Sequence, residues 1–266
     1  MTEQAGDAAV SDDGAGRGGP GEDARRPDGI PPDQGSGTIT LAVTLALVAG
    51  WVDAHVYLHV HDVFVANMSG NMIKLGMSVG LLDWPEAWPS TAALLAFVAG
   101  VAVGTRLNRR ELRHAGAART PALLAIEAAL LAVLAAGLLA TPAQHERGRW
   151  PAILALICLG ALSMGLQAAA LGRVGTIAVT TTYGTGALVR VGQRLVPPAS
   201  GLPRAVADRA RVIVILVSLL CGYVGGAAAS ALAGGAAWLM VLPVVVLVAA
   251  ASWSARPAAL AQDAGS

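Results

Sequence analysis

The sequence predicts an all-α protein, a polytopic transmembrane helical bundle with six spans. Hydrophobic residues make up 55% of the 266 residues and charged residues only 13%, and the mean hydropathy is +0.61. A water-soluble fold carries about twice that share of charge. The apolar residues also form long runs, because no charged residue occurs at 150–172 or at 212–255. About 20 apolar residues in a helix cross the hydrocarbon core, so each run is long enough for at least one crossing.

Composition divides the chain into three regions. Residues 1–37 hold eight acids and three arginines but almost no large apolar side chain, so we expect an acidic, disordered tail. This stretch lacks the basic start and apolar core of a signal peptide, so the first span is expected to act as an uncleaved insertion signal. The transmembrane domain is expected at 38–255, and residues 256–266 form a short C-terminal tail.

Six segments are expected to cross the membrane. They are residues 38–60, 88–106, 120–140, 150–172, 212–232 and 236–255. The turn between the last two is expected at Gly234 and Gly235. Two further segments, 63–82 and 176–193, are apolar but have polar, glycine-rich centres. These two segments fit either full crossings or re-entrant half-helices.

The distribution of arginine distinguishes the two topologies. Five arginines lie at 106–119 and five at 190–211, whereas the loop with Asp83 and Glu86 has no basic residue. If both polar segments crossed, the two arginine-rich loops would lie on opposite sides. If neither crosses, both loops and both termini are cytoplasmic, which favours six spans although two arginines at 141–149 then lie outside. Tryptophans fall at the expected interfaces, with Trp84, Trp88, Trp150 and Trp238 outside and Trp253 inside.

The chain contains an internal repeat. Residues 69–76 (SGNMIKLG) and 185–192 (TGALVRVG) share the pattern Ser/Thr-Gly-x-x-x-basic-x-Gly. Each copy follows one apolar helix and precedes two more, so each half has three crossings. Because three is odd, the second repeat (about 150–255) is expected to be inverted relative to the first (about 38–140). Inverted repeats with broken helices near the membrane centre are typical of many secondary transporters.

Four short stretches together resemble the YoaK-like family of bacterial membrane proteins. They are residues 50–54 (GWVDA), 64–71 (FVANMSGN), 165–167 (GLQ) and 181–186 (TTYGTG). The resemblance covers about 38–255. Ser69 stands where the family has Thr, and His55, His59 and His61 stand where mostly small or apolar residues are expected. The resemblance implies a six-helix protein of the bacterial inner membrane and implies no activity.

Asp53 is the first candidate for a functional residue. By helical rise it lies roughly 21 Å along the first span from Ile39. A carboxylate at the centre of a membrane helix costs ~2.5–3.5 kcal/mol on insertion scales, so we expect it to face a cavity or a partner. Two interpretations stay open. Asp53 is either a proton or cation site, or an anchor that pins a neighbouring broken helix through backbone N–H groups.

The polar segments are the second candidate. Gly70 and Gly186 permit a helix break or a close backbone approach. The N–H and C=O groups that a break frees must be satisfied by protein, water or ligand. The side-chain donors and acceptors are Asn67, Ser69 and Asn71 in one segment and Thr180, Thr181, Thr182, Tyr183 and Thr185 in the other. Gln167 is a candidate neutral counterpart of Asp53. These residues predict either a pseudo-symmetric binding site for a small solute or ion, or helix packing through small and hydroxyl residues.

Three further polar residues lie in or near the spans. His55 and His59 share one helical face, but a metal site needs three or four ligands, so we expect no metal and no other cofactor. These histidines are instead expected to be interfacial or pH-sensing. Glu127, inside the third span, is expected to pair with an arginine or to reach a cavity.

Small residues predict close helix packing. Two rows at a spacing of four form smooth helix faces: Ser218, Gly222, Gly226 and Ser230, and Ala96, Gly100 and Gly104. Their expected use is packing within the bundle or between protomers of a homo-oligomer. Cys158 and Cys221 are expected to pack in the core.

These observations favour a secondary transporter or channel for a small solute or ion. The main alternative is a non-transporting membrane scaffold or partner subunit. An enzyme is not expected because the sequence has no nucleophile–base motif, and the absence of a P-loop argues against direct ATP coupling. Nucleic-acid binding is not expected either, because there is no basic folded domain. The lipid bilayer is the one partner that the composition requires.

Overall fold

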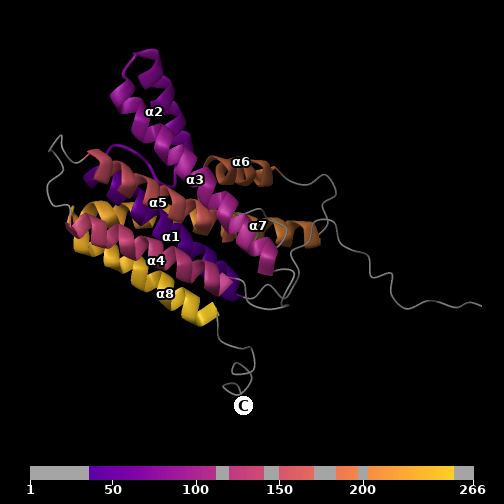
Figure 1. Ribbon diagram of the computed structural model, residues 1–266. Helices are drawn as coiled ribbons and strands as arrows, with labels where there is room; N and C mark the ends of the chain where they lie inside the picture. The colour runs from indigo at the N-terminus through magenta and orange to yellow at the C-terminus, as the bar shows by residue number, and fades with distance from the viewer. Residues whose placement is uncertain (1–35, 112–119, 141–149, 171–183, 197–202, 255–266) are drawn as a thin grey trace, which may run out of the picture.

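The described part of the computed structural model comprises residues 36–111, 120–140, 150–170, 184–196 and 203–254, and it consists of helices joined by turns (Figure 1). The helices are α1 (Ser36–His59), α2 (Met68–Gly80), α3 (Trp84–Glu111), α4 (Thr120–Ala140), α5 (Trp150–Ala170), α6 (Gly184–Leu195), α7 (Pro203–Ala233), the 3-10 helix η2 (Ala237–Met240) and α8 (Val241–Ser254). Both expected tails lie almost wholly outside the described residues.

Proline marks the start of several helices. Pro85, Pro121 and Pro151 are the second residues of α3, α4 and α5, and Pro203 is the first residue of α7. The N–H groups of a first helical turn have no acceptor within the helix, so a proline there removes no hydrogen bond and its fixed φ favours the helix.

Six helices of the described chain are long and apolar enough to cross a membrane, which confirms the expected number of spans. They are Gly37–His59, Trp84–Asn108, Pro121–Ala140, Trp150–Ala170, Arg209–Ala233 and Ala237–Ser254. By contrast, α2 has 13 residues and α6 has 12. At ~1.5 Å per residue these helices are about 20 and 18 Å long. Both are shorter than the ~30 Å hydrocarbon core, so neither is a full crossing.

Glycine lets α1 and α7 pack with their backbones in contact. Gly50 of α1 lies against the carbonyl group of Tyr223, and Gly226 of α7 lies against the carbonyl group of Leu47. A Cβ atom at either glycine would collide with that backbone. Val43 lies beside Gly222 in the same way, so residue numbers rise together along the two helices and they run parallel.

The pair α3 and α5 is built on the same principle. Gly100 of α3 lies against the carbonyl group of Leu162, and Gly165 of α5 lies against the carbonyl group of Phe97. The small-residue rows are therefore used inside the bundle, since Gly100, Gly222 and Gly226 are all buried between helices of one chain.

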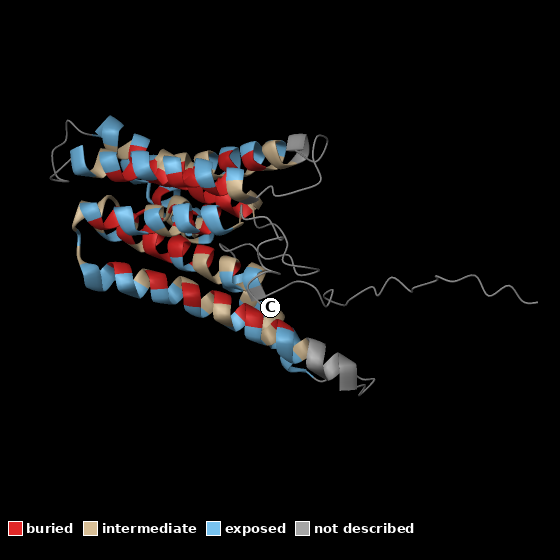
Figure 2. Ribbon diagram, turned by 90° about the horizontal axis from the view of Figure 1, so that it is seen from below, coloured by how far each residue is buried: buried red, intermediate tan, exposed pale blue. Residues whose placement is uncertain are grey.

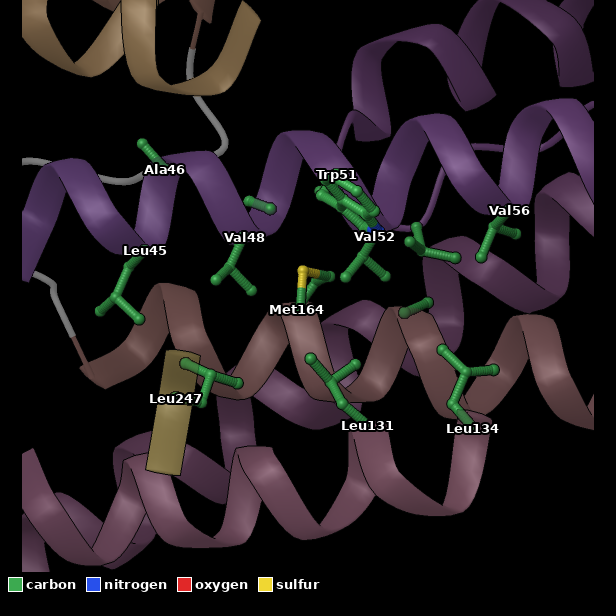
Figure 3. Close-up of a cluster of buried hydrophobic side chains, with 14 of the residues drawn as sticks. Leu45, Ala46, Val48, Trp51, Val52, Val56, Leu131, Leu134, Met164 and Leu247 are labelled. Carbon is green, nitrogen blue, oxygen red and sulfur yellow. The ribbon is translucent and has the colours of Figure 1, made fainter. Parts of the chain in front are cut away.

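The hydrophobic core lies where α1 meets α4, α5 and α8. Figure 3 shows aliphatic side chains of this cluster, among them Leu45, Val48, Val52, Val56, Leu131, Leu134, Met164 and Leu247. Within the apolar window of α1, 61% of residues are buried, against 22% in that of α8. α1 is therefore the central helix and α8 a peripheral one. Buried residues line the inner faces of the long helices and exposed residues their outer faces (Figure 2), whereas α6 has no buried residue.

Two expectations about single residues need correction. Gly70 does not break a helix, because it lies inside α2 and the break is the non-helical segment 60–67 before it. The glycine is required for space, since a Cβ there would lie 2.7 Å from the ring of Phe64. Gly186 likewise lies inside α6. Cys221 is exposed on α7 and is not part of the core, while Cys158 is half-buried; both are free thiols.

The turn at Gly234 is confirmed. Its φ of +76° lies in the left-handed region, and it ends α7 directly before Gly235 and η2. Glycine occupies that region without the steric cost that a Cβ imposes.

Candidate functional site

The carboxylate of Asp53 binds the chain that leads into α2. Its Oδ1 accepts hydrogen bonds from the backbone N–H groups of Val65 and Ala66, at 2.6 and 2.8 Å. Its Oδ2 accepts the N–H of Asn67 at 3.1 Å. Asp53 is buried, with 2% of its surface exposed. Free backbone N–H groups in such a place carry a desolvation cost, which the carboxylate removes.

Tyr223 of α7 completes the environment of Asp53. Its hydroxyl group donates to Oδ2 of the carboxylate. Gly50 lies three residues before Asp53 on α1 and receives the backbone of the same tyrosine. Because all four contacts of Asp53 come from groups that donate to it, this site fits the ionised carboxylate.

The position of these hydrogen bonds shows that the chain turns back after α1. Helix α1 ends at His59, six residues beyond Asp53. Residues 65–67 nevertheless contact Asp53, so the chain has returned about 9 Å along α1 by helical rise. Helix α2 therefore begins beside the last third of α1, with its positively polarised N-terminus toward a carboxylate. Figure 1 shows α2 and the start of α3 as a hairpin at one end of the bundle.

Asn71 holds the same turn from the α2 side. Its Nδ2 donates to the carbonyl oxygen of Phe64 at 2.6 Å, and its Oδ1 accepts the N–H of Phe64 at 3.0 Å. The side-chain amide thus pairs with both polar groups of one backbone residue. Ser69 donates to Oδ1 of Asn67 at 2.7 Å, which steadies the residue that precedes the helix.

Aromatic rings cover this turn. Phe64 stacks on Tyr57 with 4.4 Å between the ring centroids. The Lys74 ammonium lies 5.5 Å from the centroid of the Tyr57 ring, within the range of a cation–π contact. The positive charge that ends the first polar segment therefore lies over an aromatic ring.

The predicted site residues do not all come together. Asp53, Asn67, Ser69, Gly70 and Asn71 surround one turn. Gln167 of α5 lies elsewhere, because its Nε2 donates to the carbonyl oxygen of Leu45 at 3.0 Å, eight residues before Asp53 on α1. Thr185 and Gly186 lie in the first turn of α6. The main neighbour of α6 is α7, whereas the main neighbour of α2 is α3. Thr180, Thr181, Thr182 and Tyr183 lie outside the described residues.

The histidines at the end of α1 lie in different surroundings. His55 is buried with 2% exposed, and its ring centroid lies 5.0 Å from that of His59. His61, beyond the end of α1, stacks on Trp150 at 5.2 Å, and burial lowers the pKa of its imidazole below the usual value. Within the described ranges, no three residues among His, Cys, Asp and Glu are grouped to hold a metal ion.

Sequence reasoning missed Tyr223. The one signal it offers is a hydroxyl group inside the uncharged run 212–255, between glycines that pack on α1. Nothing in the local sequence links it to Asp53, which lies 170 residues earlier.

We predict that Asp53→Asn lowers the free energy of unfolding by about 2–3 kcal/mol, because an amide NH₂ would face donors in a buried place. Tyr223→Phe should cost about 1.5–3 kcal/mol through the lost hydrogen bond to a charged group. Denaturant unfolding of the purified chain in detergent measures both. The exposed Asp62 supplies the control, since Asp62→Asn should change little; equal effects of Asp53→Asn and Asp62→Asn would contradict the anchor.

Comparison with known proteins agrees with this architecture. The model of the family described as "Protein of unknown function (DUF1275)" matches residues 41–252. The chain is 33% identical over 149 residues to the UPF0700 transmembrane protein YoaK of Bacillus subtilis (strain 168); the matched segment is 56% of this chain and 63% of that protein. No solved structure matches. The chain is therefore a multi-pass membrane protein that belongs to the DUF1275 family, as its resemblance to the YoaK-like proteins predicted.

Proposed function

We propose that this chain is a secondary transporter for a small solute or ion, in which α2 is a re-entrant half-helix. The observation that carries the proposal is the return of residues 65–67 to Asp53, which starts α2 directly after the buried Val65 and Ala66 and before the level at which α1 ends. Half-helices that begin within the membrane are a recurring element of secondary transporters, since they place backbone dipoles and free polar groups at depth.

An inverted repeat is the second part of the proposal, and the glycine contacts support it. Gly165 and Leu162 of α5 lie 115 residues after Gly50 and Leu47 of α1. The partners of these residues on α7 and α3 also differ by one constant offset, because Gly226 and Tyr223 lie 126 residues after Gly100 and Phe97. An exchange of the two halves would map the pair α1–α7 onto the pair α5–α3.

This pairing has a consequence for movement. Each close pair joins a helix of one half to a helix of the other, and the closest contacts of each pair are glycine against backbone. Glycine against backbone makes a smooth surface at these points, and the Tyr223–Asp53 hydrogen bond holds α1 and α7 together beside it. We propose that the halves rock against each other there to open the solute path alternately to the two sides.

Asp53 has a structural role in this mechanism. It occupies the anion position at the N-terminus of α2 and neutralises the positive end of that helix. The transported solute therefore does not bind there as an anion. The half-helix stays at its depth because the carboxylate holds it, and transport depends on Asp53 through that position.

We also place both termini on the cytoplasmic side, because this puts the arginine-rich segments 106–119 and 190–211 inside. A fluorescent protein fused to the C-terminus should fold and fluoresce in bacteria, while an alkaline phosphatase fusion at the same place should be inactive. The opposite pair of results would contradict this orientation.

Flux into vesicles tests the transporter directly. The full chain is reconstituted into phosphatidylcholine vesicles, and light scattering follows their swelling after addition of glycerol, urea, glycine, sodium chloride or potassium acetate. We expect at least one of these solutes to cross faster than in protein-free vesicles. The rate should fall in Asp53→Asn and stay unchanged in Asp62→Asn at matched protein content.

One observation favours a non-transporting scaffold or partner subunit instead. The protein itself supplies all four contacts of Asp53, so this carboxylate leaves no acceptor for a solute. If no solute crosses faster than in protein-free vesicles, and the chain co-purifies from its native membrane with a second protein in fixed ratio, the scaffold replaces the transporter.

A further inference from the structure

Glu127 is a second buried carboxyl group, and its surroundings differ from those of Asp53. It lies near the middle of α4 with 0% of its surface exposed. Neither of its oxygen atoms has a hydrogen-bond partner. An ionised carboxylate without a partner is very costly in such a place, so the group must be neutral or must hold a cation.

No charged side chain faces Glu127 from the described helices that pack against α4. These helices are α5, η2 and α8. Their one titratable residue is Cys158, which packs at the level of the far end of α4, near Gly137. The expected pairing of Glu127 with an arginine is therefore not seen within the described chain.

The register of α4 and α5 shows what Glu127 faces. A Cβ on Gly160 would lie 3.6 Å from a methyl group of Leu134, and a Cβ on Gly137 would lie 2.5 Å from one of Leu156. Residue numbers rise on α4 as they fall on α5, so the helices are antiparallel. Seven residues make about two turns and return to the same helix face.

The helix faces that meet at Leu134 and Gly160 form one stripe between α4 and α5. Two turns from that contact, this stripe holds polar residues. Glu127 lies seven residues before Leu134, and Gln167 lies seven residues after Gly160. Their shared stripe thus places Glu127 opposite Gln167. Ser163, four residues before Gln167 on the same face, is also fully buried.

The free atoms of these three residues are complementary once Glu127 carries a proton. Gln167 donates its Nε2 to a carbonyl oxygen of α1, so its unpartnered atom is the acceptor Oε1. An acceptor cannot pair with a carboxylate, but it can accept the O–H of a carboxylic acid. The hydroxyl group of Ser163 is also unpartnered and makes no hydrogen bond to Glu127 in this structure, so it can donate to the second oxygen of the acid only after the side chains turn toward each other.

We propose that Glu127, with Gln167 and Ser163, forms a proton-binding site inside the bundle. One proton binds one carboxylate oxygen, and the neutral acid replaces a buried charge. In the arrangement described here the site is protonated. If the chain is a transporter, as proposed above, release of this proton when the halves move couples solute movement to a proton gradient; that coupling alone rests on the proposed function.

Infrared spectroscopy of the full chain in phosphatidylcholine vesicles tests the site without any solute. At pH 7 we expect the C=O stretching band of a protonated carboxylic acid, which shifts when H₂O is replaced by D₂O. The band should be lost in Glu127→Gln and kept in Glu86→Gln, a change at an exposed glutamate. In Gln167→Met it should move to higher frequency, because the acid loses its acceptor.

Several outcomes would overturn the site. A band that persists in Glu127→Gln would contradict the proposal, as would the absence of the band from the parent chain. Carboxylate bands that respond to sodium in place of the acid band would make Glu127 a metal-cation ligand. If Glu127→Gln fails to fold, Glu127→Asp provides the second variant, and a band that does not shift there also contradicts the proposal. Absence of solute flux leaves the spectrum unaffected, so failure of the transporter and failure of the proton site are distinguishable.

Discussion

The hydrogen bonds from Asp53 to three backbone N–H groups and the Tyr223 hydroxyl are the interaction on which the other features of the structure depend. They bring the chain back along α1, fix the buried segment that leads into α2 and join α1 to α7. Tyr223 reaches the carboxylate because its own backbone packs on Gly50, one turn earlier on α1. The glycine contacts and the buried charge thus act together. The close approach of α1 and α7 lets the Tyr223 hydroxyl reach Asp53, and that hydroxyl is the fourth donor to the carboxylate.

The two buried carboxyl groups illustrate how neighbours decide protonation. Donors alone surround Asp53, which favours the ionised form. The face of α5 toward Glu127 carries an amide oxygen, which can only accept, and a hydroxyl group, and this favours the neutral acid. One carboxylate therefore anchors a backbone segment, and the other is suited to bind and release a proton. The two groups belong to different levels of the bundle, since Gln167 contacts Leu45, about 12 Å before Asp53 by helical rise.

Composition and run length were enough to predict the six spans, because the bilayer sets the required length and allows few charges. The turn at Gly234 was predictable because glycine, which has no Cβ, adopts a positive φ at little cost, and Gly234 has a positive φ in the structure. The role of Asp53 could not be decided, because its partners lie 12 to 14 and 170 residues away. The choice between a helix break and a close approach at Gly70 could not be made, because a sequence does not distinguish a glycine needed for conformation from one needed for space beside Phe64. Gln167 was expected to be a polar site residue. Its position opposite Glu127 could not be predicted, because it depends on the register between α4 and α5.

Hydrogen–deuterium exchange in lipid nanodiscs tests the central claim, that Asp53 holds the start of α2 through backbone N–H groups. The amides of Val65, Ala66 and Asn67 should exchange slowly in the parent chain although they lie in a non-helical segment. In Asp53→Asn their exchange should accelerate by about tenfold or more, while the amides in the middle of α4 keep their rates. Fast exchange at these three positions in the parent chain, or no change on substitution, would contradict the account.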